Sequence, residues 1–521
     1  MLMTLFVPVI ITPVPPLTDY PNHLARCYLL AFGDSDRVLG QMFSRQWQII
    51  PNVAIDLILP RLMHVFSPLT AGRIMLVLCL LIPTTGAIAL NYAYFKRRSL
   101  WQIATGFAAY NVLFLMGFMN FAIGIGVAMW GAAAWVRYRE SHLWASVLFA
   151  AFLSPVLFFF HLFGLCFYAL LICSYEFFIV FVCWTSKGVN IRFALHRVLM
   201  FAVTMMAPLL LYLRSPLEKL SFDPVWPSFS RKIYLAFDWI LEYSRLFDLF
   251  VATSLVAFLV FCVINGRAFI SKAGLVASTT LFCVYLVTPF AFKGVYFVDT
   301  RLPVMLGFMM FAAFLPRGLT SNKRYVAAVF FAVLLVARVS FVSRVWVDSE
   351  RDLDSVRSVI QVVRPGSRVL VTEVTGNDNP GWYESMPISR RIPEVAPTYW
   401  HLASFLLLDR HAFWPNIFAD ASQQPIAVKE PYRELQAVHG ALPNYVDLTR
   451  HQLAEDVLEH FPFLVEWQQK FDYVLLLNAE GVPNLSHFLP DRLRLVDSKG
   501  IAALFEVRKA DRSAIMPSFI Q

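Results

Sequence analysis

The sequence predicts a polytopic α-helical membrane protein that ends in a soluble α/β domain. Hydrophobic residues make up 58% of the 521 residues and charged residues only 15%, a balance that suits a lipid solvent. Apolar runs recur as far as residue 343, after which charged residues are spread throughout. We therefore expect a transmembrane domain over residues 1–344 and a soluble extracytoplasmic domain over residues 345–521.

About eleven transmembrane helices are expected, because a helix needs about 20 apolar residues to cross a bilayer. Residues 1–13 form the first apolar run, and they lack a basic segment and a small-residue cleavage site, so we interpret them as a retained helix. The other runs lie at 72–94, 102–117, 119–136, 143–160, 162–184, 194–213, 246–264, 273–290, 302–316 and 325–343. The loop at 14–71 mixes charged and apolar side chains, which predicts amphipathic helices on the outer membrane surface.

The basic residues are arranged as in a protein inserted in a membrane. The net charge of +9 is also typical of some nucleic-acid-binding proteins, but here the basic side chains gather in short loops between apolar runs. These loops are 96–98, 137–139, 187–197, 267–272 and 317–324, and all fall on the inner side if the N-terminus is cytoplasmic. We expect an integral protein of a bacterial inner membrane with a periplasmic C-terminal domain and no nucleic-acid partner.

The tail after residue 345 has the pattern of a small α/β domain. Strand patterns occupy 368–374 and 473–477, a hairpin pattern lies at 493–507, and helical patterns lie at 349–363, 397–411 and 448–460. The acidic and histidine residues of the tail have no spacing typical of a catalytic motif, so we expect the tail to act as a lid or to contact an acceptor. Six of the seven cysteines lie in apolar runs, which predicts neither a disulfide framework nor a cysteine metal site.

A carboxylate, an imidazole and a guanidinium follow the first apolar run closely: those of Asp19, His23 and Arg26. Proline is tolerated in a first helical turn, so a helix that starts near Tyr20 places Asp19 at its N-terminal end. There Asp19 either caps the helix or, as an ionised carboxylate, accepts a proton from an acceptor hydroxyl. His23 and Arg26 either hold an anionic group or lie among the lipid headgroups.

Other polar side chains lie at the edges of apolar runs. His161 divides two runs and either faces a cavity or is satisfied by the backbone of a turn. Lys232 precedes an aromatic stretch, where a lipid phosphate and the membrane surface explain it equally well. The next outer loop carries Lys293, Asp299 and Arg301. Because an unpaired charge in lipid is costly, Arg301 needs a partner, either Asp299 or a lipid phosphate.

This layout resembles the GT-C superfamily of integral-membrane glycosyltransferases. Members of that superfamily have many spans, an acidic residue in the first outer loop just after the first span, surface helices in that loop, and often a soluble domain after the last span. The sharpest match is Asp19 within residues 18–23. The Asp-Glu pair that several members carry after the first span is absent, because Tyr20 follows Asp19.

The resemblance implies transfer of a sugar from a polyprenyl-phosphate donor to a lipid, glycan or protein acceptor on the outer face, with inversion at the anomeric carbon. The resemblance then makes Asp19 the catalytic base or the group that orients the acceptor. The donor phosphate is held by His23, Lys232, Lys293 and Arg301, and the cavity is lined by Arg26, His161 and Asp299. No metal ligand is assigned and the cofactor stays unknown, since the sequence does not indicate a divalent metal. Two alternatives stay open: a polysaccharide polymerase or ligase that uses lipid-diphosphate-linked glycans, and a non-catalytic transporter or scaffold.

Overall fold

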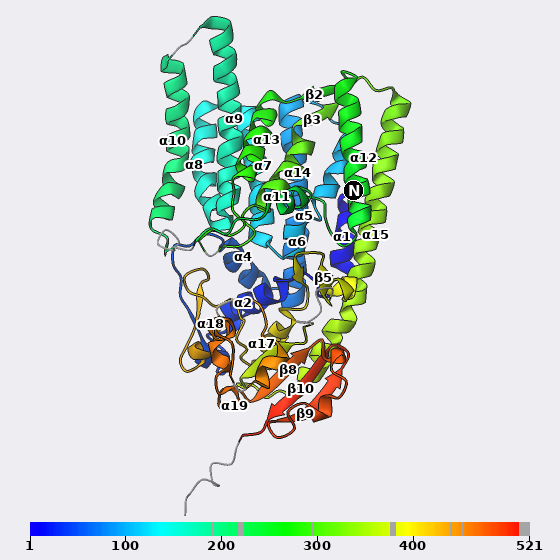
Figure 1. Ribbon diagram of the computed structural model, residues 1–521. Coiled ribbons are helices and arrows are strands. Elements are labelled where there is room, and N and C mark those ends of the chain that lie inside the picture. Colours follow the sequence, from blue (N-terminus) through cyan, green and yellow to red (C-terminus); the bar gives the residue numbers. More distant parts are fainter. Residues whose placement is uncertain are drawn as a thin grey trace, which may run out of the picture.

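The computed structural model describes residues 1–188, 191–216, 223–293, 295–375, 382–437, 440–450 and 452–509. Figure 1 shows a bundle of long helices above a region of short helices, loops and a sheet that contains the C-terminal part of the chain. We call the end of the bundle that meets this region the tail-side end. The opposite end, where helix α5 (Pro68–Phe95) finishes and helix α15 (Ser321–Val359) begins, is the distal end.

Among the described residues, seven helices are long and apolar enough to cross a membrane. They are α5, α7 (Met119–Tyr138), α8 (Leu143–Phe160), α9 (Leu162–Lys187), α10 (Ile191–Leu213), α12 (Arg245–Ile264) and α15. Three shorter apolar helices accompany them: α1 (Leu2–Ile11), α13 (Lys272–Leu286) and α14 (Arg301–Ala312). The chain is therefore an integral membrane protein of the expected helical class, whereas the expected count of about eleven transmembrane helices is not confirmed.

The apolar run at 102–117 was expected to be a transmembrane helix, and this expectation is wrong. It forms a 3₁₀ helix, η1 (Leu100–Ala108), followed by the single-turn helix α6 (Val112–Leu115). Arg338 of α15 donates hydrogen bonds to the carbonyl oxygens of Phe107 and Tyr110, at 2.8 and 3.3 Å. A break in a helix inside a membrane protein is tolerated where buried side chains satisfy the freed backbone groups, as Arg338 does here.

Helix α15 joins the membrane bundle to the tail without a break. It has 39 residues and includes both the expected span at 325–343 and most of the expected helix at 349–363. No glycine or proline interrupts the chain between 321 and 359, so nothing in the backbone ends the helix where the apolar stretch ends. The domain boundary expected at 344/345 therefore falls inside one continuous helix.

The tail contains a four-stranded sheet in the order β4-β8-β10-β9. Strands β4 (Val369–Glu373) and β8 (Tyr473–Leu477) run parallel and are buried along their whole length, while β10 (Ala502–Val507) pairs antiparallel with both β8 and β9 (Leu493–Lys499). Strand β8 covers the same residues as the expected strand. The expected helix at 397–411 is the 3₁₀ helix Leu402–Ser404 followed by α17 (Phe405–Arg410), and the one at 448–460 narrows to α18 (Glu455–His460).

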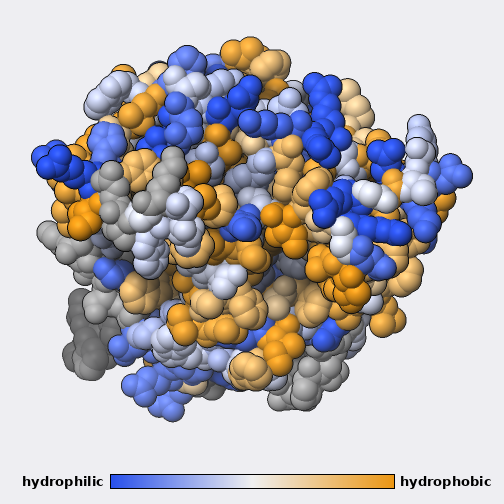
Figure 2. Space-filling model, turned by 90° about the horizontal axis from the view of Figure 1, so that it is seen from above, coloured by the Kyte–Doolittle hydropathy of each residue, from blue (hydrophilic) through white to orange (hydrophobic). Residues whose placement is uncertain are grey.

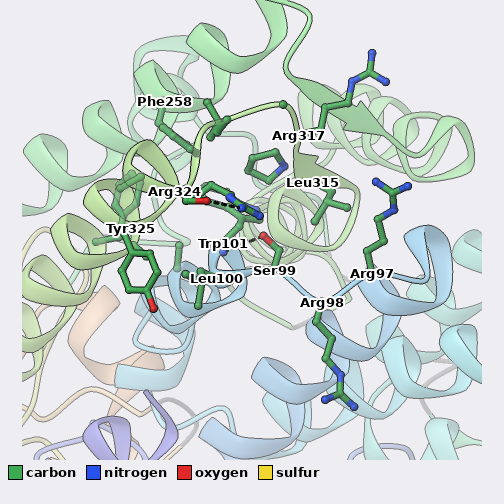
Figure 3. Close-up of a pocket in the computed structure, with 18 of the residues that line it drawn as sticks. Arg97, Arg98, Ser99, Leu100, Trp101, Phe258, Leu315, Arg317, Arg324 and Tyr325 are labelled. Carbon is green, nitrogen blue, oxygen red and sulfur yellow. Dashed lines mark hydrogen bonds between the residues drawn. The ribbon is translucent and has the colours of Figure 1, made fainter.

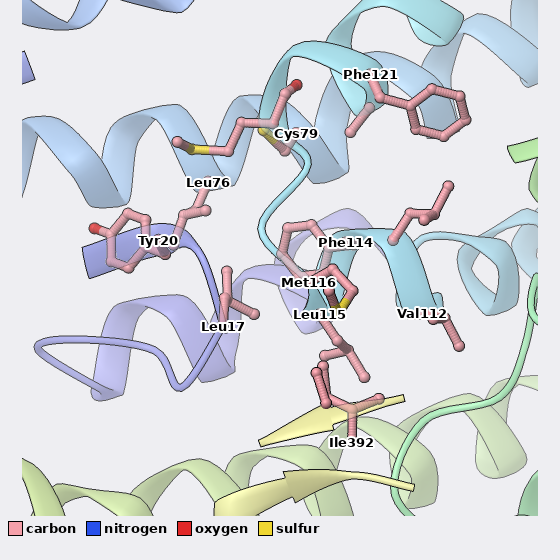
Figure 4. Packing of buried hydrophobic residues seen from close by; sticks show 14 of the residues in the cluster. Leu17, Tyr20, Leu76, Cys79, Val112, Phe114, Leu115, Met116, Phe121 and Ile392 are labelled. Atoms are coloured by element: carbon pink, nitrogen blue, oxygen red, sulfur yellow. The ribbon is translucent and has the colours of Figure 1, made fainter. Parts of the chain in front are cut away.

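The loop after the first helix is held between the bundle and the tail. Ten of the 13 residues of α2 (Tyr20–Phe32) are buried, so this helix does not lie on the membrane surface with a polar face in water. The tail covers part of this loop, since strand β1 (Phe43–Arg45) of the loop pairs antiparallel with tail strand β7 (Ile426–Val428). Figure 4 illustrates the shared core, in which Leu17 and Tyr20 of this loop, Leu115 and Met116, and Ile392 of the tail are all buried.

The remaining elements are short. They are α3 (Leu39–Met42), α4 (Ala54–Met63), α11 (Phe229–Leu235), α16 (Trp382–Ser385) and α19 (Trp467–Lys470), with the strand pairs β2 (Ala268–Ile270) with β3 (Phe314–Pro316) and β5 (Arg391–Ile392) with β6 (Ala396–Pro397). The β2–β3 pair closes the distal end, and the β5–β6 pair lies near the tail-side end.

Candidate active site around Asp19

Asp19 occupies the N-cap position of α2, but its side chain makes no capping hydrogen bond. Its side chain accepts no hydrogen bond from the helix N-terminus, and Pro21 occupies the first turn. The backbone N–H of Asp19 donates instead to the carbonyl oxygen of Met116, at 3.0 Å. The structure thus removes the capping role as the reason for a carboxylate at this position, and leaves a side chain that is 18% exposed at the tail-side end.

The carboxylate of Asp19 faces a histidine from the tail. Its Oδ1 atom lies 3.4 Å from Nε2 of His401, whose side chain is only 3% exposed. This separation is long for a hydrogen bond, as catalytic contacts commonly are before a substrate binds. Sequence patterns did not identify His401, because it belongs to no motif and reaches Asp19 only through the docking of the tail.

Asn22 of α2 fixes how this histidine presents its proton. The side-chain oxygen of Asn22 accepts the backbone N–H of Phe418 at 2.9 Å, so its amide nitrogen points the other way, 3.1 Å from Nδ1 of His401. A neutral imidazole that accepts a hydrogen bond at Nδ1 carries its proton on Nε2, the atom that faces Asp19. The hydrogen bond from Asn22 therefore favours the tautomer in which Nε2 of His401 donates toward the Asp19 carboxylate.

A tight turn at residues 116–118 connects Asp19 with Arg301. Gly117 adopts φ +90°, and a Cβ atom built on it would lie 3.0 Å from the backbone nitrogen of Tyr20 and 3.3 Å from Cβ of Asp19. The glycine thus lets the turn pack directly against Asp19. On the next residue, the ring centroid of Phe118 lies 5.2 Å from the guanidinium carbon of Arg301.

Arg301 is buried, with only 4% of its surface exposed. One of its terminal nitrogens donates to the carbonyl oxygens of Tyr296 and Phe297, at 2.9 and 2.6 Å. Its Nε atom is buried and has no hydrogen-bond partner among the described residues. An ion pair with Asp299, one of the two alternatives for Arg301, does not form within 4.0 Å, since Asp299 faces Lys232. Arg301 therefore keeps an unpaired buried donor.

The ring of Phe163 lies between His161 and Arg301. The ring of Phe163 is 5.2 Å from the Arg301 guanidinium and 5.8 Å from the His161 ring. Nδ1 of His161 accepts the backbone N–H of Phe163 at 3.0 Å and so caps α9. Of the two alternatives for this histidine, a hydrogen bond to the backbone of a turn is therefore correct for its Nδ1 atom.

Lys232 uses its donors within the protein. Its ammonium group donates to the carbonyl oxygens of Tyr285 and Thr288, at 2.7 and 2.6 Å, and lies 3.7 Å from the buried carboxylate of Asp299. Burial lowers the pKa of Lys232, and burial raises the pKa of Asp299 although Lys232 opposes that shift. An ammonium group has three protons, so this arrangement occupies them and does not favour a phosphate ligand.

Asp238 is a buried acid that sequence reasoning missed. No part of the residue is exposed, and the hydroxyl of Thr300 is a hydrogen-bonding neighbour of its carboxyl group. Burial raises the pKa of Asp238 well above its usual range, and repulsion from Asp299 adds to the shift. The available signal was an acid between Phe237 and Trp239 in a mostly apolar stretch.

Neither His23 nor Arg26 is placed as a free cation for an anionic group. Burial, followed by the charges of Arg26 and His401, holds the pKa of His23 well below its usual range, so this histidine is neutral and is not a cation for a phosphate. Arg26 pairs with Asp56 of α4 through two contacts of 2.6 and 3.1 Å, and both side chains are almost fully buried. This pair ties α2 to α4.

Lys293 lies in a turn of the loop at 291–301, half-buried and with φ 50°. Among the described residues there is no group of three or more His, Cys, Asp or Glu side chains arranged to hold a metal ion. Asp19 therefore lies against His401 and the 116–118 turn, while Arg301 contacts this turn through the ring of Phe118 and borders His161 through Phe163.

The chain was compared with known proteins. No protein-family model matches the sequence, and no curated protein matches it. Two solved structures of ArnT from Cupriavidus metallidurans, one in the apo state and one bound to undecaprenyl phosphate, are similar to this chain. Each is 12% identical, and the match covers 97% of this chain and 96% of that one, with TM-scores of 0.49 for the apo form and 0.48 for the bound form.

Proposed function

We propose that this chain is an integral-membrane glycosyltransferase of the GT-C type, which moves a sugar from a polyprenyl-phosphate donor to an acceptor hydroxyl on the outer face of the membrane. The observation that supports this most is the Asp19 carboxylate. It is free of any capping role and is set against His401, a donor oriented by Asn22.

The reaction is a single displacement at the anomeric carbon. The acceptor oxygen forms a bond to that carbon while the bond from the carbon to the phosphate oxygen breaks, and its electron pair leaves with the polyprenyl phosphate. Asp19 takes the acceptor proton as general base, and the N–H of His401 holds the carboxylate in place. Attack from the face opposite the leaving phosphate inverts the configuration of the sugar.

Arg301 is the group best suited to the departing phosphate. The phosphate gains a second negative charge as the sugar leaves, and a fixed cation at that point stabilises the transition state. Arg301 has a buried donor without a partner, whereas the donors of Lys232 are occupied by two carbonyl oxygens and Asp299. A guanidinium is also the usual partner of phosphate groups in buried sites.

The orientation follows from the basic loops. They gather at the distal end, which by the positive-inside rule supports a cytoplasmic distal end and an outer side that carries Asp19 and the tail, in our proposal the periplasm of a bacterial inner membrane. The acceptor is then a lipid, glycan or protein hydroxyl that reaches the tail-side end from outside.

The test is a transfer assay with the full chain in proteoliposomes and a panel of polyprenyl-phosphate hexoses and pentoses. Asp19→Asn should lower kcat by about 10²- to 10⁴-fold, the usual contribution of a general base. Asp34→Asn is the matched control, because Asp34 is an exposed acid of the same loop paired with Arg45 at the surface. Equal turnover by Asp19→Asn and wild type contradicts the role of Asp19, and no turnover by wild type with any donor of the panel contradicts the function.

A further inference from the structure

A cavity of about 410 Å³ opens at the distal end, on the side of the bundle opposite Asp19. Four arginines line it: Arg97, Arg98, Arg317 and Arg324. They come from the turn after α5 and from the segment around the start of α15, and Figure 3 shows Arg324 at the centre with the side chains of the other three extending from the rim in different directions. Figure 2 looks onto this end, where hydrophilic residues are interspersed with hydrophobic ones.

The positive charge in this cavity is not balanced. Its lining contains no Asp or Glu, and none of the four arginines forms an ion pair within the part of the chain that the structure describes. Arg97 and Arg317 both lie over the ring of Phe269, at 5.3 and 4.5 Å from its centroid, which holds them beside the cavity. Like charges that are gathered without an acid partner favour an anion between them.

The wall of the cavity also offers a neutral donor. Trp101 lines it and is 6% exposed, and the indole N–H has no hydrogen-bond partner among the described residues. A buried donor of this kind normally has a partner, so its presence in the wall adds to the case for a polar ligand.

An apolar cavity of about 430 Å³ continues from the basic one, between α12 and α15. The two share Phe258, Leu319, Ala327 and Phe331 in their linings. Val326 and Phe330 line the second cavity and are exposed on α15, a helix that crosses the membrane. The combined site therefore has a cationic head at the membrane boundary and an apolar extension along two transmembrane helices.

We propose that this site binds a membrane lipid with an anionic phosphate headgroup, with the phosphate among the four arginines and an acyl chain along the α12–α15 groove. The positive charge of the arginines favours a phosphate, and the apolar groove favours a ligand with a hydrocarbon tail. Arginines that merely reach the membrane surface would not need a shared cavity joined to an apolar groove. The site lies at the other end of the bundle from Asp19, so it does not depend on the transfer reaction.

The test is native mass spectrometry of the full chain in neutral detergent, titrated with dioleoyl phosphatidylglycerol. Dioleoylglycerol supplies the tails without phosphate, and inorganic phosphate supplies the anion without tails. Arg317→Gln with Arg324→Gln should weaken phosphatidylglycerol binding by about tenfold or more. Ala327→Trp keeps every charge and fills the junction of the two cavities, so it should weaken binding as well.

The control is Arg137→Gln with Arg192→Gln, two exposed arginines of the same end outside the cavity. This control should bind phosphatidylglycerol as wild type does. The proposal is overturned if the control loses as much affinity as the cavity variant, if neither cavity variant loses affinity, or if dioleoylglycerol binds as well as phosphatidylglycerol. It is also overturned if inorganic phosphate at equal concentration displaces the lipid, because the tail then contributes nothing.

Discussion

The imidazole of His401 faces the carboxylate of Asp19 across the junction of the tail and the membrane bundle, with Nε2 and Oδ1 3.4 Å apart. The tail is therefore more than a cover for the site, since it supplies the group that orients the proposed base. The same junction is closed by the β1–β7 strand pair and by Asn22, which contacts both His401 and the backbone of Asn416.

Replacement of His401 should affect turnover more than acceptor binding. His401→Phe removes the donor that faces Asp19, and kcat should fall by about 10- to 100-fold, because one oriented donor is lost near the reacting proton. His401→Gln keeps an N–H that reaches toward Asp19 and should recover part of this loss. The measurement is kcat and acceptor KM for both variants. Equal losses by the two variants would mean that His401 serves packing only.

Replacement by asparagine should affect protein stability differently at the two buried acids near Lys232. Asp299→Asn leaves the ammonium of Lys232 buried without its carboxylate and should destabilise the protein by about 3–5 kcal/mol. Asp238→Asn should cost less, because burial and Asp299 raise the pKa of Asp238 and so disfavour the charged form of its carboxyl group. Thermal unfolding in detergent near neutral pH compares the two variants. A larger drop in Tm for Asp238→Asn than for Asp299→Asn is incompatible with this assignment.

Glu373 should make the stability of the tail depend on pH. Burial raises its pKa from 4.5 to about 7, although the hydroxyl of Tyr399 donates to its carboxylate at 2.6 Å. Since the folded pKa is the higher one, the stabilisation is complete below pH 4.5 and is lost as the pH rises through about 7. The loss is on the order of 3 kcal/mol.

Glu373→Gln removes this titration and should raise Tm relative to wild type at about pH 8 but much less at about pH 5. Glu459→Gln, which changes an exposed acid of the tail, is the control. A Tm difference between Glu373→Gln and wild type that stays constant over this pH range would refute the shift.

The Arg26–Asp56 pair should be structural. Asp56→Asn leaves a buried guanidinium without its carboxylate, and removal of one partner from such a pair costs about 3–5 kcal/mol. Arg26→Met together with Asp56→Leu removes both charges and should recover much of that loss. Tm values of the single and double variants measure this. If the single variant lost turnover at unchanged Tm, Arg26 would belong to the site instead.

Apolar run length predicted most of the membrane helices, because lipid requires long helices with satisfied backbones. It failed at 102–117, where a tertiary contact lets the helix break. Arg338 of another helix donates to the carbonyl oxygens at the end of η1, and the hydropathy of the run itself contains no information about that side chain. It also failed to anticipate that α15 runs on past the membrane, since an apolar stretch ends there but the helix does not.

The candidate site was predictable only where the residue carried a local signal. Asp19 stood out because a carboxylate follows the first apolar run directly. His401 could not be found, since its contact with Asp19 exists only after the tail docks on α2. Lys232 looked like a phosphate ligand because a sequence does not reveal the carbonyl oxygens of Tyr285 and Thr288 that occupy it.

The central claim is that Asp19 and His401 act as one unit, with the carboxylate as base and the histidine as its support. A double-mutant cycle on kcat, with Asp19→Asn, His401→Phe and the combined variant in the polyprenyl-phosphate transfer assay, tests it most directly. The combined variant should be no slower than Asp19→Asn alone, because His401 has nothing to orient once the base is gone. Losses that multiply in the combined variant would contradict the claim, since the two residues would then act independently.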